Sequence, residues 1–145
     1  MKDKSSTEWT SFNGYQYKVI ANFTVQFNFS FAQNICISLD SNLVSIHSTE
    51  ENNFVSDLIE KFPTNYTELT KFAWIGLQQD CNVWKWIDGS PMDFQNWKIN
   101  EPDISGRKEC GIICRDKSSL CNGWESWYCS KISQTITITV CKKPV

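Results

Sequence analysis

The chain has 145 residues, with 14 lysines and arginines against 16 aspartates and glutamates, so its formal net charge is −2. The charges form no basic block, which argues against a nucleic acid or an anionic membrane as the partner. The length predicts one domain, and no apolar run reaches the roughly 18 residues of a membrane-spanning helix.

The first forty residues predict a polar tail, a strand and a helix. Residues 1–8 are polar and lack the apolar core of a signal peptide, so we expect a mature or excised segment whose domain covers residues 9–145. Gly14–Val25 has the aromatic and β-branched content of a strand. Ser30–Leu39 predicts a helix with Ser30 as its N-cap. Its apolar residues lie at helical spacing: Phe31, Ile35, Cys36 and Leu39.

A second helix is predicted directly after His47. Ser48 and Glu51 form a capping box, in which each side chain satisfies the other residue's backbone N–H. Five apolar residues follow at helical spacing: Phe54, Val55, Leu58, Ile59 and Phe62. Pro63 ends the helix. For His47, the only histidine, we expect a neutral or hydrogen-bonded surface role rather than catalysis.

The second half of the chain predicts short strands around a long loop. Phe72–Leu77 and Val83–Ile87 are strand-like, with Trp84 and Trp86 on one face of the second segment. Residues 88–109 hold no periodic segment and predict a long loop, which in a compact domain is usually either functional or disordered. Thr135–Val140 alternates as TITITV, which places Ile136, Ile138 and Val140 on one face. Two helices followed by strands and a long loop indicate the α+β class.

Seven cysteines and three glycosylation sequons favour an oxidising, extracellular setting. The chain has no C-x-x-C pair and one histidine, which argues against a cysteine–histidine metal site. The sequons begin at Asn22, Asn28 and Asn65.

The segment Lys98–Ser105, KINEPDIS, places the carboxylates of Glu101 and Asp103 on either side of Pro102. Paired carboxylates are typical of one half of a site for a hard cation such as calcium, which takes 6–8 oxygen ligands.

These motifs together resemble the C-type lectin-like domain, in order over residues 14–143. The resemblance is carried by Asn42–His47 (NLVSIH), Trp74–Leu77 (WIGL), Trp84–Gly89 (WKWIDG), Asn96-Trp97, Glu101–Asp103 (EPD), Cys110, Cys129 and Cys141. It implies a double-looped fold, with two helices flanking small antiparallel sheets and a long-loop region for any ligand. It also implies that six of these residues are core: Trp74, Ile75, Gly76, Leu77, Trp86 and Trp97. Trp127 is the tryptophan that we expect on the ligand surface, because Trp124 and Trp127 cannot share a strand face.

The resemblance implies the disulfides Cys36–Cys141 and Cys110–Cys129 and a cis bond between Glu101 and Pro102. Of the three remaining cysteines, Cys114 and Cys121 are close enough in sequence to close a short excursion. Cys81 would then be unpaired, which makes a disulfide-linked dimer through Cys81 an open alternative to a free thiol.

The resemblance also implies a calcium ligand set that is incomplete in this chain. In sugar-binding members, Trp-Asn-Asp precedes the third core cysteine and an acid lies two residues before the second. Here Trp124, Glu125 and Ser126 stand in the place of Trp-Asn-Asp. Lys108 stands in the place of the acid, with Glu109 beside it. Glu101, Asp103 and Glu125 remain as metal ligands, so we expect calcium to bind weakly or not at all. Lys108 either neutralises these acids or is a solvated loop residue.

Two functions follow, and neither is enzymatic. The first is a secreted binding module that recognises carbohydrate through the long-loop face with degenerate or weak calcium dependence. Its expected surface is Glu101, Asp103, Lys108, Glu109, Glu125, Ser126 and Trp127. The alternative is an extracellular protein–protein interaction domain without sugar binding. A glycosidase built on the paired carboxylates is not expected, because nothing in the sequence specifies the separation across a cleft that such enzymes need.

Overall fold

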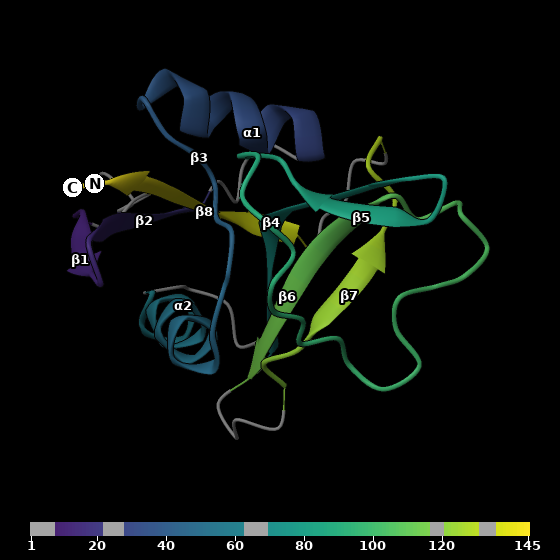
Figure 1. Cartoon of the computed structure of the whole chain (residues 1–145). Coiled ribbons are helices and arrows are strands. Elements are labelled where there is room, and N and C mark those ends of the chain that lie inside the picture. The colour runs from purple at the N-terminus through teal and green to yellow at the C-terminus, as the bar shows by residue number, and fades with distance from the viewer. Residues whose placement is uncertain (1–7, 22–27, 63–69, 117–120, 131–135) are drawn as a thin grey trace.

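The computed structural model describes residues 8–21, 28–62, 70–116, 121–130 and 136–145 (Figure 1). It confirms the α+β class, with two helices lying on opposite sides of one mixed sheet. Among the described residues, no helix combines the length and the apolar character that crossing a membrane requires. The elements are β1 (Thr10–Phe12), β2 (Tyr15–Ala21), α1 (Phe29–Ser38), β3 (Asn42–Leu43), α2 (Thr49–Lys61), β4 (Thr70–Asp80), β5 (Val83–Trp86), β6 (Cys110–Asp116), β7 (Trp124–Trp127) and β8 (Ile136–Pro144).

The strands form a sheet of order β1-β2-β8-β4-β6-β7, with β3 paired to β8 and β5 paired to β4. The expected antiparallel pairing is found for every pair of described strands except β4 and β8, which run parallel. Here the two central strands meet across a long sequence separation, which local hairpin signals do not reveal. β4 therefore contacts β5, β6 and β8 and connects the two halves of the molecule.

Helix α1 begins earlier than the cap expected at Ser30. Its N-cap is Asn28, whose side-chain oxygen accepts a hydrogen bond from the Phe31 N–H at 3.1 Å. Asn and Ser cap helices about equally well, so Asn28 competes successfully for the first turn. The buried face of α1 consists of Phe29, Ala32, Gln33 and Cys36, whereas Phe31 is 44 % exposed. The predicted inner face of this helix was therefore wrong for Phe31.

Helix α2 keeps its predicted cap but not the predicted reciprocal bond. The Ser48 side chain accepts from the Glu51 N–H at 3.0 Å, as the capping box requires. The Glu51 carboxylate instead accepts from the His47 N–H at 2.7 Å. Its other oxygen accepts from the Tyr17 hydroxyl at 2.5 Å and from the Lys142 ammonium at 2.6 Å. Glu51 therefore joins α2 to β2 through a hydrogen bond and to β8 through a buried ion pair.

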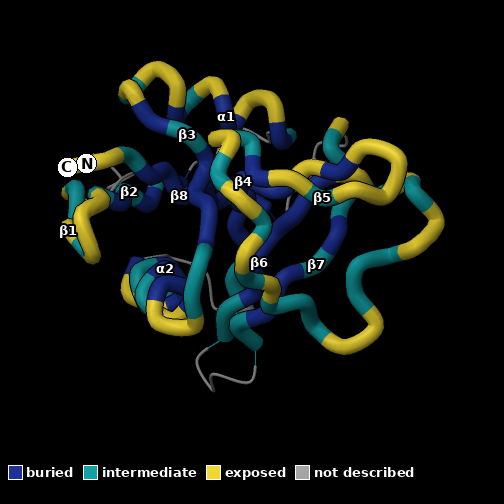
Figure 2. Tube along the Cα trace, viewed as in Figure 1, coloured by how far each residue is buried: buried dark blue, intermediate teal, exposed yellow. Residues whose placement is uncertain are grey.

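The predicted core is confirmed for WIGL and for Trp86, all of which are buried, whereas Trp97 is only partly buried (Figure 2). Gly76 allows β4 to approach the β3 connection: its N–H donates to the Val44 carbonyl at 2.8 Å, and an added Cβ would lie 2.8 Å from the Leu43 carbonyl oxygen. Trp84 and Trp86 share one face of β5, opposite Gln79 and Leu77 of β4. The shared inner face of Ile136, Ile138 and Val140 is also confirmed.

Three disulfides lie within the chain, as expected: Cys36–Cys141, Cys110–Cys129 and Cys114–Cys121. Cys81 is exposed and unpaired at the tip of the β4–β5 hairpin, where Cys81 and Asn82 both have positive φ. The dimer through Cys81 receives no support, because all three disulfides are intramolecular. The tail at residues 1–7, the end of the predicted strand at 22–25, Pro63 and Thr135 lie outside the described residues.

We predict that Glu51→Gln destabilises the fold by about 3–5 kcal/mol, because it leaves the buried Lys142 ammonium without its counter-charge. Urea unfolding at neutral pH measures the change. Glu50→Gln is the matched control, since Glu50 is the exposed neighbour in the same helical turn, and it should shift the free energy of unfolding by less than about 0.5 kcal/mol. Adding Lys142→Met to Glu51→Gln should recover part of the loss; no recovery would contradict the charge argument.

Candidate functional site

The long loop at residues 88–109 is anchored on strand β7 through Trp124. The Trp124 N–H donates to the Asn96 carbonyl at 2.8 Å, and the Trp124 carbonyl accepts from the Lys98 N–H at 3.0 Å. The buried indole N–H of Trp124 donates to the Asn52 side chain of α2 at 2.8 Å. Beyond this stem the loop extends away from the sheet (Figure 1), and Ile99 and Ile104 are 89 % and 92 % exposed.

Ser126 connects the two carboxylate-bearing residues that flank Pro102. Its N–H and its hydroxyl both donate to Glu101 Oε1, at 2.9 and 2.8 Å. The same hydroxyl oxygen accepts from the Asp103 N–H at 2.9 Å. The Glu101–Pro102 bond is cis, which confirms that expectation. A 1 % exposed serine on β7 thus bridges both flanks of Pro102.

Lys108 lies beside the second carboxylate. Its ammonium is 3.8 Å from Asp103 Oδ2 and 5.6 Å from the ring centroids of both Trp127 and Tyr128. Hydrogen bonds from the backbone and side chain of Ser105 lower the pKa of the Asp103 carboxyl, and the charge of Lys108 lowers it further. Glu101, Asp103, Lys108 and Ser126 form the Glu101 cluster. Lys108 therefore forms an ion pair with Asp103, one of the three acids that it was expected to neutralise. This result is intermediate between the two predicted roles, neutralisation of all three acids and a solvated loop residue.

Glu125 and Glu109, both expected in the ligand surface, have other surroundings. Glu125 Oε1 lies 3.3 Å from the Lys98 ammonium, and its other oxygen is buried with no hydrogen-bond partner among the described residues. Glu109 is exposed and borders a separate hollow with Gln78, Asp80 and Lys85. Trp127 lies beside the cluster and is partly buried.

Two contacts of this region were missed from the sequence. Lys98 reaches Glu125 because Trp97 pairs with Trp124 in a parallel bridge, which brings the following residues of the two segments together. Tyr128 lies under Lys108 next to Trp127. Pairing of an irregular loop with a strand leaves no periodic signal, so only the two aromatic residues after Ser126 could have pointed to the second contact.

The donors of this region do not suit a bound calcium ion. Calcium takes six to eight oxygen ligands, and its affinity depends on the charge that those ligands supply. Here Ser126 occupies Glu101 Oε1, Lys108 lies beside Asp103, and Lys98 lies beside Glu125. Within the described parts of the chain, no three His, Cys, Asp or Glu side chains gather to hold a metal. The expectation that calcium binds weakly or not at all at Glu101, Asp103 and Glu125 stays a prediction.

The glycosylation sequons fall unevenly on the structure. Asn28 lies within the described residues, and its side-chain oxygen caps α1 by accepting the Phe31 N–H. The side-chain amide nitrogen of Asn28 takes no part in that hydrogen bond. Asn22 and Asn65 lie outside the described residues. Glycosylation at the three positions stays a prediction.

We predict that Lys108→Glu, Glu125→Asn and Ser126→Asp, combined, raise calcium affinity to a dissociation constant of about 10⁻⁴–10⁻³ M, typical of extracellular calcium modules. Isothermal titration calorimetry measures the affinity. Without calcium the variant should unfold more readily than the natural chain, because the carboxylate that replaces the Ser126 hydroxyl would face Glu101 as a second acceptor instead of donating to it. Calcium should reverse that loss. An unmodified domain that binds calcium as tightly as the variant would contradict the prediction.

Comparison with known proteins identifies the family. The family model described as lectin C-type domain matches residues 25–143. Ladderlectin of Oncorhynchus mykiss is 38% identical over 85 residues, which cover 57% of this chain and 42% of ladderlectin. The type-2 ice-structuring protein of Osmerus mordax is 33% identical over 141 residues, covering 95% of this chain and 70% of that protein.

A solved structure, that of herring type II antifreeze protein, matches with 30% identity and a TM-score of 0.70, covering 96% of this chain and 98% of the other. The chain spans less than half of the ladderlectin that it matches. The expected family is confirmed by the agreement of the family model, the fold and the relatives. The chain belongs to the C-type lectin domain family.

Proposed function

We propose that the chain is an extracellular, non-enzymatic carbohydrate-binding module whose long-loop face binds glycans with little or no dependence on calcium. The observation that carries the proposal is the position of the Ser126 hydroxyl, which donates to Glu101 and accepts from the Asp103 N–H. This bridge supplies the cross-link between the two flanks of Pro102 that an ion would otherwise supply. The three intramolecular disulfides support an extracellular location.

The exposed groups around the bridge suit sugar hydroxyls. The Asp103 side chain is 33 % exposed and supplies a carboxylate acceptor, while Lys108, 24 % exposed, supplies ammonium donors. Hydrogen bonds to charged groups are the stronger class. The neighbouring rings of Trp127 and Tyr128 offer apolar surface for the C–H face of a sugar ring. An acceptor, a donor and an aromatic wall therefore lie within one small area.

The carbohydrate proposal is tested by a glycan array probed in calcium and again in chelator. Binding should persist in chelator, and Asp103→Asn should weaken it about tenfold or more, the value of one hydrogen bond to a charged group. Asparagine still accepts the Ser105 N–H, so the loop should keep its shape. The matched control is Asp40→Asn, at an exposed position with positive φ that asparagine tolerates. Binding that disappears in chelator would refute calcium independence, and an array without signal would refute carbohydrate recognition.

A protein ligand is the second candidate, favoured by the two isoleucines of the loop. Ile99 and Ile104 are almost fully exposed on either side of the Glu101–Asp103 tripeptide. Large apolar side chains that remain exposed on a binding loop are typical anchors for a protein surface.

The two candidates are separated by a cell-binding assay before and after enzymatic removal of surface glycans. If the partner is a protein, labelled domain should still bind the deglycosylated cells, and the double variant Ile99→Ser with Ile104→Ser should lose that binding. If the partner is a glycan, deglycosylation should abolish binding and the double variant should bind normally. The free energy of unfolding should be unchanged in the variant, because both side chains are exposed.

A further inference from the structure

The sequon that begins at Asn28 lies where an attached glycan leaves the fold intact. The Asn28 side-chain oxygen caps α1, and within the described parts of the chain no hydrogen bond engages its amide nitrogen. Asn28 is partly exposed, and Ser30, the hydroxyl residue of the sequon, is exposed. N-linked glycans are attached through the amide nitrogen, and the product keeps the carbonyl oxygen as an acceptor. The helix cap and a glycan therefore use different atoms of Asn28.

The attachment point is held in place by Phe29, the middle residue of the sequon. Phe29 is 2 % exposed, and its ring meets the Trp74 ring edge-on, with 5.9 Å between the two centroids. The Phe29 N–H donates to the Cys129 carbonyl at 3.2 Å. The start of α1 is therefore fixed both to the core and to the chain that follows β7.

The bond to Cys129 brings Asn28 close to the long-loop face. Tyr128, whose ring centroid lies 5.6 Å from the Lys108 ammonium, directly precedes Cys129. Cys129 is also joined by a disulfide to Cys110, with 5.2 Å between the two Cα atoms, and Lys108 lies two residues before Cys110. Because each residue spans at most about 3.6 Å, these steps place the Lys108 backbone within about 20 Å of Asn28. A branched oligosaccharide of many sugar rings spans that distance.

We propose that Asn28 carries an N-linked glycan that lies over the end of the long-loop face formed by Lys108, Trp127 and Tyr128, and that limits the access of ligands to this face. In the transfer, Asn28 Nδ2 forms a bond to C1 of an oligosaccharide carried on a lipid diphosphate. The bond from C1 to the diphosphate oxygen breaks, the lipid diphosphate leaves, and Nδ2 loses one proton. A transferase of the secretory route supplies the donor, so the inference rests on the extracellular location and the long-loop face of the proposed function.

Partial cover of the face lowers the apparent affinity for a ligand without removing any contact. The apparent affinity falls in proportion to the fraction of molecules that can bind, so a face that is open for one-tenth of the time binds about tenfold more weakly. Loss of the glycan should therefore strengthen binding to the long-loop face.

The first test asks whether Asn28 is modified, and it needs no ligand. The chain is secreted from a glycosylating cell line with Thr24→Ala and Thr67→Ala, which remove the other two sequons. Peptide-N-glycosidase in heavy-oxygen water converts a glycosylated asparagine to a labelled aspartate, which mass spectrometry locates. The label should appear at Asn28 and should be absent when Ser30→Ala is added. An unlabelled Asn28 would overturn the proposal.

The second test locates the glycan by its shielding of a lysine. The Lys108 side chain is 24 % exposed, so a bulky amine-acylating reagent can reach it. Acylation of Lys108 should be about tenfold slower in the glycosylated chain than in Ser30→Ala, in proportion to the time for which the face is covered. Lys61 is exposed at the end of α2, on the other side of the sheet, and should react equally in both chains. Equal acylation of Lys108 would overturn the placement of the glycan.

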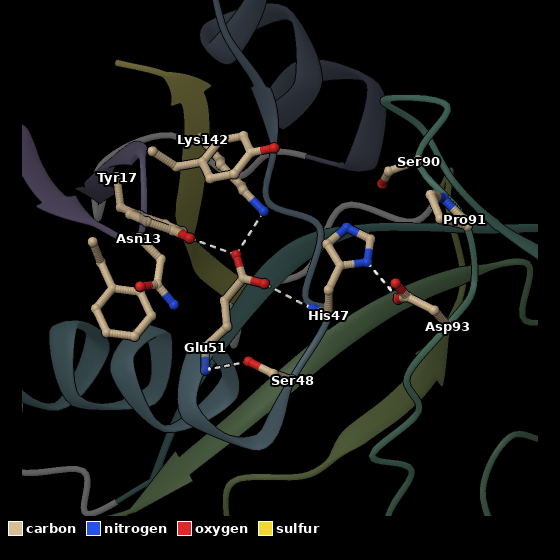
Figure 3. A pocket seen from close by; sticks show the side chains of 11 residues that line it. Asn13, Tyr17, His47, Ser48, Glu51, Ser90, Pro91, Asp93 and Lys142 are labelled. Carbon is tan, nitrogen blue, oxygen red and sulfur yellow. Dashed lines mark hydrogen bonds and ion pairs between the residues drawn. The ribbon is translucent and has the colours of Figure 1, made fainter.

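A relocated glycan separates the effect of position from that of bulk. Tyr15→Thr, combined with Ser30→Ala, moves the sequon to Asn13 in the turn of the β1–β2 hairpin. Figure 3 shows Asn13 near Tyr17, and in Figure 1 this hairpin lies at the opposite end of the molecule from the long loop. A glycan at Asn13 should leave Lys108 as reactive as in Ser30→Ala alone. Shielding of Lys108 from this distant position would overturn the proposal.

Binding to the glycan array then measures the effect on the face. Ser30→Ala should bind about tenfold more tightly than the glycosylated chain, with its fold unchanged, because Ser30 is exposed and Asn28 keeps its cap. Equal binding would overturn the inference and leave the proposed function standing. An array without signal for Ser30→Ala would refute carbohydrate recognition, whereas the label at Asn28 and the acylation of Lys108 would still decide whether the glycan is present and covers the face.

Discussion

The buried side chain of Trp124 determines how the long loop is held. Its indole N–H bonds to α2, its backbone bonds to Asn96 and Lys98 on both sides, and its ring packs against Trp86, Phe94 and Trp97. One residue of β7 therefore joins a helix, a second strand and the stem of a loop that has no regular structure of its own. Because β7 pairs with β6 in a defined register, Ser126 has a fixed position relative to the tip of the loop. The functional face depends on this register.

The chemistry of that face differs from a calcium site in the residue that holds the loop together. Calcium draws acceptors together, whereas the residue that draws Glu101 and Asp103 together here is a hydroxyl that donates and accepts at once. An ionised aspartate in place of Ser126 would accept only and would repel Glu101. The serine is thus compatible with a closed loop in the absence of a metal, and Lys108 further offsets the negative charge of Asp103.

Local signals in the sequence predicted the parts of the fold that depend on neighbouring residues. The Ser48 cap, the tryptophan face of β5 and the alternation in β8 all follow from spacing within a few residues. The disulfides Cys36–Cys141 and Cys110–Cys129 and the core motif followed from the family resemblance, and Cys114–Cys121 followed from the closeness of its two cysteines in the sequence. Contacts between distant residues were not predictable: Tyr17, Glu51 and Lys142 converge across the sheet, so Glu51 was assigned to its own helix cap. For the same reason the connections between Glu101, Asp103, Lys108 and Ser126 were not predicted, and Glu109 and Glu125, which were expected in the same surface, have other surroundings.

The Ser126 bridge also has a consequence for how a bound ligand would be released. A site completed by a dissociable ion can be emptied by lowering the concentration of that ion or by protonating its ligands. The Ser126 hydroxyl is covalently part of the chain, and the pKa of Asp103 is lowered rather than raised. Depletion of calcium therefore leaves the connections between Glu101, Ser126 and Asp103 in place. Release from this face would depend on the dissociation rate of the ligand and on competition.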